Sequence, residues 1–222
     1  VALVGEQGRI GDEQLLVMNA EKASFTLQAE PGPEAPALSL LRRFSAPVNV
    51  QLEQPLQESL QLLAHDDDPF SRWDAGQRLA RQVLLARAAD QPDATVETAL
   101  ISALRQRLSA YGGSGGQDLA ILLALPGTAE LEALQNPVDP LALYAARREW
   151  IADLGRHLSE PLHRLLERCR GDWGQAWPEG QGARSLTGLA WAWLAAAGDA
   201  EARQQALEAV SGPSMTLARA AL

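Results

Sequence analysis

Three histidines lead the short set of side chains that could do chemistry in this chain. A zinc metallopeptidase places two histidines four residues apart on one helix face, with a glutamate beside the first as general base. The histidines here are His65, His157 and His163. The last two are six residues apart, about 240° around a helix, and Pro161 disturbs the turn beside Glu160. We therefore expect no catalytic, metal-binding or cofactor-binding residue in this chain.

Residues 65–68 read His-Asp-Asp-Asp and could suggest a cation site. A calcium loop, however, spaces its carboxylates at alternate positions and adds a glycine and a distal glutamate. A structural interpretation accounts for these residues better. His65 suits the C-terminus of one helix, where positive charge is favoured, and Asp68 suits the N-cap of the next.

The glycine run and the single cysteine also favour structural roles. A phosphate-binding loop needs a strand before it and usually a Lys-Ser/Thr pair after it, whereas Gly112–Gly116 follows a helical pattern and precedes no lysine. We interpret it as a flexible connector. Cys169 shares a helix face with Leu162 and Leu166, which predicts a small core residue rather than a nucleophile.

Composition and charge exclude some classes of partner. The 222 residues carry a formal net charge of −9, whereas nucleic acids and anionic membranes require clustered positive charge. No run of about 18 apolar residues is available to cross a membrane. A lone cysteine allows no intrachain disulfide. We expect no nucleic-acid or membrane partner and a cytoplasmic location.

The secondary structure that must position these side chains is predicted to change from strands to helices near residue 54. Before it, short apolar or alternating runs and a proline-rich linker at Pro31, Pro33 and Pro36 predict about four strands. The strand predictions cover Val1–Val4, which pairs in a hairpin with Leu15–Met18, then Ala23–Gln28 and Ser45–Leu52, where Val48, Val50 and Leu52 alternate with Asn49 and Gln51.

After residue 54 the apolar residues follow helical spacing, and Asp-Pro or Pro-Asp signals open several helices. One segment, from Pro140 to Cys169, keeps its phase through Pro161 and predicts a single kinked helix. A helix near Met215 is still apolar at Leu222. The predicted fold is mainly α: an incomplete β-sandwich-like portion over 1–53, then an α-superhelical domain of stacked helix pairs over 54–222, truncated at its C-terminus.

Two phrases in this chain resemble a known family. Arg43–Val48 (RFSAPV) and Phe70–Gln77 (FSRWDAGQ) are similar to the bacterial aminopeptidase N branch of the zinc aminopeptidases. Weaker similarity continues through Asn136–Pro140, Arg184–Leu186 and Met215–Thr216, so it covers the chain, thinly after about Gln82. In that family the two phrases lie at the end of a small β-sandwich and the start of the helical C-terminal domain. The resemblance therefore implies a fragment whose catalytic, zinc-binding domain lies upstream.

The same phrases suggest a structural junction between strands and helices. Trp73 is expected to be buried there, and Arg72 and Asp74, two residues apart, must find partners elsewhere because they do not face each other on a helix. Gly76 leaves room for close packing. The predicted junction residues are Arg43, Phe44, Pro47, Asp68, Phe70, Arg72, Trp73, Asp74 and Gly76.

Two functional hypotheses stay open on the sequence. By resemblance, the first is a non-catalytic segment of a zinc-dependent aminopeptidase N, which hinges and walls a chamber for peptide substrates and has the parent's catalytic domain as its partner. The second is a free-standing α-helical-repeat module that binds other proteins. An unpaired strand edge and an apolar final helix also predict self-association through these cut edges.

Overall fold

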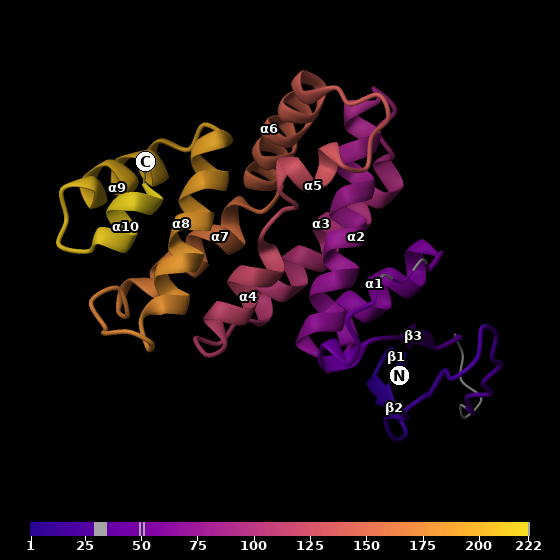
Figure 1. Cartoon of the computed structure of the whole chain (residues 1–222). Coiled ribbons are helices and arrows are strands. Elements are labelled where there is room, and N and C mark those ends of the chain that lie inside the picture. The colour runs from indigo at the N-terminus through magenta and orange to yellow at the C-terminus, as the bar shows by residue number, and fades with distance from the viewer. Residues whose placement is uncertain (29–34, 49, 51, 222) are drawn as a thin grey trace. The chain divides into compact units, whose positions relative to one another are not determined.

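The computed structural model describes residues 1–28, 35–48, 50 and 52–221 (Figure 1). The chain divides into two compact units, Val1–Leu79 and Ala80–Leu222, which are described separately below. A three-stranded sheet near the N-terminus is followed by helices to the end of the described chain, which confirms the mainly α fold with a small β portion. Pro31, Pro33, Asn49, Gln51 and Leu222 lie outside the described residues.

The sheet of the first unit has the strand order β2-β1-β3, and both pairings are antiparallel. β1 (Ala2–Gly5) turns through two residues into β2 (Gly8–Ile10), and Gly8 has φ +104°, which a residue with a side chain rarely adopts. β3 (Ala37–Ser39) follows Pro36 and forms an edge strand. Its neighbour α1 (Leu56–His65) contacts β1 and β3, so the buried side chains of Val4 and Ala37 share a core with Leu62 and Leu63 of the same unit.

Three of the predicted strands are not seen in the described residues. Leu15–Met18 and Ala23–Gln28 are irregular, and so are the described residues between Ser45 and Leu52. Leu15 is 85% exposed, and Val17 and Val48 are also exposed, so these alternating side chains have no core to enter. β1 instead pairs with the nearer Gly8–Ile10, which closes a much shorter loop.

The compact first unit extends beyond residue 53 because α1 and the start of α2 (Pro69–Ala88) are bonded to the strand region. Gln61 donates its side-chain amide to the carbonyl of Val4 at 3.0 Å, and Gln54 donates to the carbonyl of Leu38 at 2.9 Å. Secondary structure therefore changes close to the predicted position, whereas the packing unit includes the first helix and a half.

Capping residues fix where several helices of the chain begin. Asp93, Asp139 and Asp199 each accept hydrogen bonds from backbone N–H groups of the first turn, and Ser214 accepts one from Leu217. The helices are α3 (Ala94–Ala110), α4 (Gly116–Leu123), α5 (Thr128–Glu132), α6 (Pro140–His157), α7 (Ser159–Arg170), α8 (Gln181–Ala196), α9 (Ala200–Val210) and α10 (Met215–Ala220).

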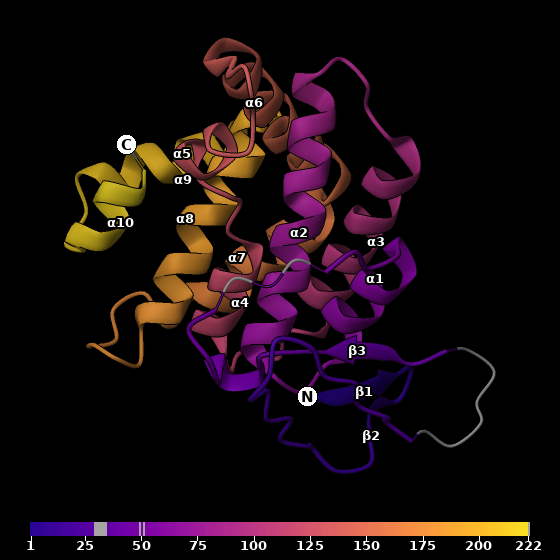
Figure 2. The ribbon, with the colours of Figure 1, turned by 45° about the vertical axis from the view of Figure 1, so that its right-hand side comes forward.

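α8 is the central helix of the second unit, and α4, α6, α7, α9 and α10 all contact it (Figure 2). Its inward side chains include Leu186, Trp191 and Leu194, which are buried. Close approach depends on glycine where α6 meets α8, because a Cβ on Gly155 would lie 2.0 Å from the carbonyl oxygen of Trp193. Because Gly155 has no side chain, the backbones of α6 and α8 can lie in close contact at this point.

The predicted single helix from Pro140 to Cys169 is two helices in the structure. α6 ends at His157, Leu158 has φ −109° and ψ 16°, and α7 starts at Ser159. Pro161 is then the third residue of α7, where its missing N–H would have no intrahelical acceptor. The prediction of one kinked helix is wrong because the proline is accommodated by a new first turn.

One ionic cluster joins three helices of the second unit. Arg87 donates two hydrogen bonds to Glu97, at 2.7 and 2.9 Å, and pairs with Asp153 at 2.7 Å. Its guanidinium lies 4.8 Å from the ring centroid of the buried Trp150. The end of α2 is thereby fixed to α3 and α6 by charge as well as by apolar contact.

Across the described part of the chain, no helix combines the length and apolar character needed to cross a membrane.

Candidate functional site

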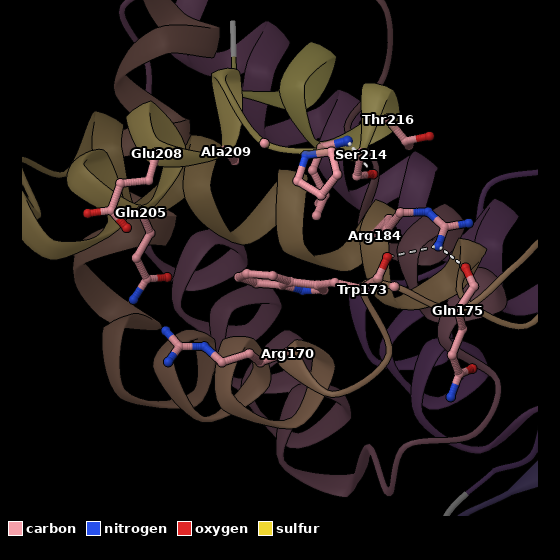
Figure 3. A pocket seen from close by; sticks show the side chains of 13 residues that line it. Arg170, Trp173, Gln175, Arg184, Gln205, Glu208, Ala209, Ser214 and Thr216 are labelled. Carbon is pink, nitrogen blue, oxygen red and sulfur yellow. Dashed lines mark hydrogen bonds between the residues drawn. The ribbon is translucent and has the colours of Figure 1, made fainter.

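A pocket of about 790 Å³ lies in the second unit, and α7, the segment 171–180, α9 and α10 provide its walls (Figure 3). Its volume falls in the range typical of small-molecule sites. Both apolar and charged residues line it. The lining residues that bear on its chemistry are Arg170, Trp173, Arg184, Gln205, Glu208 and Ser214.

Trp173 provides the aromatic surface of this pocket, and its ring is held in place. Its indole N–H donates to the hydroxyl of Thr187 at 2.8 Å, and the ring packs edge-to-face against Trp191 with 5.5 Å between centroids. Figure 3 shows the indole between Arg170 on one side and Ser214 on the other. Because the N–H hydrogen bond and the contact with Trp191 hold the ring, its face towards Ser214 is preorganised.

Arg184 fixes the segment that carries this tryptophan. Its guanidinium donates to the backbone carbonyls of Trp173 at 3.2 Å and of Gln175 at 2.6 Å. Gly180 is required beside it, because a Cβ there would lie 2.2 Å from Nη1 of Arg184. The charge of Arg184 is thus directed at carbonyl oxygens, and its role is to position Trp173.

The remaining charges of the pocket are not used in ion pairs within the described chain. Arg170 is exposed, and its guanidinium lies 5.8 Å from the centroid of Trp173. Glu208 is exposed on α9 and accepts a hydrogen bond from the amide of Gln204 at 2.9 Å. Gln205 accepts from the Trp191 indole N–H at 3.2 Å and donates to Glu201 at 3.1 Å, which fixes its amide. The wall formed by α9 therefore presents a free carboxylate and an oriented amide.

Only part of this site carries a signal in the sequence. Trp173 anchors its loop, whereas Trp177 is 75% exposed. Arg170 and Glu208 were not singled out, because they are 38 residues apart and ordinary in composition. The feature that could have indicated the site is Trp173, which follows three residues after the arginine that ends α7.

The predicted junction residues of the first unit come together in part. Phe70 packs against Phe44 with 5.2 Å between ring centroids and against Trp73 with 5.7 Å. Asp68 caps α2 through the Ser71 N–H at 2.8 Å and also accepts the Arg43 N–H at 3.0 Å. Trp73 was predicted to be buried but is half-buried, and Phe44 at the other end of this ring cluster is 63% exposed.

The other predicted junction residues have lesser roles. Asp74 pairs with Arg78, one helical turn on, at 3.3 Å. Pro47 is exposed, Arg72 is half-buried, and Gly76 is buried within α2. Arg42, next to the predicted Arg43, is a further junction residue that no local pattern in the sequence indicates. Its buried guanidinium binds Asp66 at 2.5 Å and also pairs with Asp67.

The three histidines of this chain lie on three different helices. His157 ends α6, whereas His163 lies on α7 and pairs with Asp199 at 2.9 Å. His65 ends α1. Within the residues that the structure describes, no group of three His, Cys, Asp or Glu side chains is arranged to hold a metal ion. Cys169 is buried, and that burial raises the pKa of its thiol to about 11.

The helical part matches the family described as "Domain of unknown function (DUF3458_C) ARM repeats" over residues 56–222. The chain belongs to this family. Aminopeptidase N of Caulobacter vibrioides is 36% identical over 165 residues, which cover 74% of this chain and 19% of that protein. Aminopeptidase N of Escherichia coli is 29% identical over 148 residues, 66% of this chain and 17% of that protein. The resemblance to aminopeptidase N is thereby confirmed.

A solved structure shares the fold of nearly the whole chain. The crystal structure of Legionella pneumophila aminopeptidase A in complex with aspartic acid superposes with a TM-score of 0.83, covering 99% of this chain and 27% of that one at 24% identity. At this identity the likeness shows the fold. The chain spans about a fifth of the length of the curated relatives it matches, so it is related to a C-terminal segment of an aminopeptidase.

Proposed function

We propose that this chain is the non-catalytic C-terminal segment of a zinc-dependent aminopeptidase N, an enzyme that removes N-terminal residues from peptides. The observation that carries this proposal is the 36% identity to the Caulobacter vibrioides aminopeptidase N over 165 residues. Zinc and the general base would belong to the catalytic domain of the parent polypeptide, which is the partner of this segment. Peptides are the substrates of the parent.

A structural role for the segment is supported by how its side chains are used. The buried charge of Arg42 and the half-buried charge of Arg87 join elements to one another, and the contacts of the predicted junction include ring packing and a helix cap. Such contacts fix the relative positions of strands and helices within a unit and do not present groups to a substrate. We infer that the segment hinges and walls the substrate chamber of the parent.

A chimeric enzyme tests this function. The matched segment of the Caulobacter vibrioides aminopeptidase N would be replaced by this chain, with a deletion of the same segment as control. We expect the chimera to hydrolyse alanine p-nitroanilide and to keep the parent's preference for short over long peptides, whereas the deletion loses activity or that preference. A chimera that folds and holds zinc but no longer distinguishes peptide lengths would contradict the wall role.

The isolated chain gives a second readout. We expect no turnover of amino-acid anilides and no stoichiometric zinc after dialysis against a chelator, because its histidines are dispersed over α1, α6 and α7. Turnover above the blank that co-purifies with the chain would contradict the non-catalytic assignment.

We also propose that the isolated chain self-associates. Leu207 is 67% exposed and Met215 85% exposed on α9 and α10, and Leu15 is 85% exposed in the first unit. Apolar side chains exposed in this way favour association between copies. Light scattering across a dilution series should show a mass that rises with concentration, and a constant monomer mass would reject this expectation.

A further inference from the structure

We propose that the pocket beside Trp173 is a binding site for the side chain of arginine or lysine, a cation on an aliphatic stem, presented by a peptide. The proposal rests on the shape and charge of this pocket in the second unit and does not depend on the aminopeptidase function. Nothing in the pocket's chemistry requires a metal or a covalent step.

The aromatic floor supplies the first part of the recognition. The face of a tryptophan attracts cations more strongly than that of any other side chain. The protein itself uses one side of this ring in that way, because the Arg170 guanidinium lies 5.8 Å from its centroid. The ring is locked by Thr187 and Trp191, so a ligand that stacks on the side towards Ser214 pays little to order it (Figure 3).

A carboxylate at the pocket wall supplies the second part. Glu208 accepts a neutral amide hydrogen bond from Gln204 and takes part in no ion pair within the described chain. A guanidinium or ammonium that reaches it gains a charge-assisted hydrogen bond. Because Glu208 is exposed and lies on a regular helix, it can meet such a ligand without rearrangement of the backbone.

The two arginines of the pocket do not cancel this carboxylate. Arg184 is directed at the carbonyls of Trp173 and Gln175. Arg170 also lines an adjoining pocket of about 370 Å³, where Glu167 and Glu201 lie. Its guanidinium also lies against the side of the Trp173 ring away from Ser214 (Figure 3), so the indole separates its charge from a ligand on the Ser214 side and leaves Glu208 for that ligand.

The apolar lining matches an aliphatic stem. Ala209, Pro213 and Leu217 contribute apolar surface to the pocket, and Ala209 follows Glu208 directly on α9. Basic side chains bury their methylene groups against such surfaces while the charged head stays near a carboxylate. A purely aromatic or acidic ligand would leave either this surface or Glu208 unused.

The test compares two probes of the same shape with the full chain. Nα-acetyl-arginine amide carries the guanidinium, and Nα-acetyl-citrulline amide replaces it with a neutral urea. Binding is followed by the indole N–H signals in heteronuclear NMR, with the Trp173 signal assigned by Trp173→Phe. We expect the arginine probe to shift the Trp173 signal and the citrulline probe to bind about tenfold more weakly, as the loss of one charged hydrogen bond predicts.

Glu208→Gln should weaken the arginine probe by a similar factor, about tenfold, and leave the citrulline probe unchanged. Glu149→Gln is the matched control, because it removes the same charge from an exposed position on α6 outside the pocket. Equal binding of the two probes would overturn the proposal. It would also fail if Glu149→Gln weakened the arginine probe as much as Glu208→Gln, or if the Trp173 signal did not move at millimolar probe.

Discussion

Replacement of Arg42 should damage the first unit more than any other single charge change there. Its side chain is 3% exposed and donates to Ser39 Oγ at 3.0 Å, to Asp66 Oδ1 at 2.5 Å and to Glu13 at 3.2 Å. A fourth bond goes to Asp67. The guanidinium thus connects the end of β3 to the turn between α1 and α2. Arg42→Met keeps much of the stem and removes all of these bonds.

The magnitude follows from what is left behind. The Asp66 side chain is 0% exposed, and one of its oxygens already lacks a hydrogen-bond partner. Removing one partner of a buried ion pair leaves an uncompensated charge and costs about 3–5 kcal/mol of unfolding free energy. Arg43→Met is the matched control, since the Arg43 side chain is 80% exposed and lies 3.6 Å from Glu13. An exposed pair of this kind contributes about 0–1 kcal/mol.

Hydrogen exchange with mass spectrometry resolves the effect by unit. In Arg42→Met, backbone amides of β1, β3 and α1 should exchange about 100-fold faster or more, because each 1.4 kcal/mol is a factor of ten. Amides of α8 report on the second unit and provide the internal reference. Arg42→Met combined with Asp66→Asn should recover part of the protection, since the stranded charge is gone. Unchanged protection in Arg42→Met, or an equal loss in Arg43→Met, would refute the reasoning.

Three further predictions follow from packing and charge. Gly155→Ala should lower the melting temperature by an amount equivalent to about 1–3 kcal/mol, because its Cβ would strike the Trp193 carbonyl, whereas Gly171→Ala meets nothing within 4 Å and should be neutral in the same calorimetric scan. Burial opposes ionisation of Asp153, but Arg87 and Arg156 outweigh it and lower the pKa of this carboxyl. The free energy of unfolding that this carboxylate contributes should therefore be present above about pH 4 and be lost as pH falls further. Asp153→Asn should lose less unfolding free energy in acid than the unsubstituted chain. Equal falls of unfolding free energy with pH in the two proteins would contradict this. Cys169, its thiol pKa raised to about 11 by burial, should react with a disulfide reagent at pH 8 far more slowly in the native chain than in denaturant, and equal rates would show that the thiol is accessible.

Helix positions could be predicted from sequence because their signals are local. Asp93, Asp139 and Asp199 accept first-turn N–H groups within three residues, so the capping residue and its helix are read in one short window. The same locality explains the error at Pro161. Helical phase continues across Leu158, and phase alone does not reveal that one residue leaves the helical conformation.

Strand pairing could not be predicted in the same way. β1 had several alternating or apolar runs available as partners, and its partners in the structure are the short Gly8–Ile10 and the distant Ala37–Ser39. Pairing depends on which runs find a buried face against α1, and that is a property of the assembled unit. Leu15 and Val17 belong to an alternating pattern, but no buried sheet face receives their side chains, so both are exposed.

The candidate pocket was hidden from sequence for a related reason. Its ring comes from the segment after α7, its carboxylate from α9 and its positioning arginine from α8. None of these residues stands out from its neighbours in the sequence. The close contacts around Gly155 and Gly180, which seat α6 on α8 and Arg184 against its loop, are likewise visible only once the backbones are in place.

The acidic run after α1 shows how a chemical motif depends on a distant side chain. Seen alone, Asp66, Asp67 and Asp68 resemble cation ligands, yet in the structure each carboxylate has a different task. Asp66 is buried and satisfies Arg42 and the Asp68 N–H at 2.9 Å. Asp67 is drawn between Arg42 and Arg9; burial opposes its ionisation, but these arginines outweigh it and lower its pKa. Asp68 caps α2. A cation site needs carboxylates that converge on one point. Here Arg42, 24 residues before Asp66, instead binds the carboxylates of Asp66 and Asp67 and neutralises their charge. The acidic segment therefore holds parts of the first unit together.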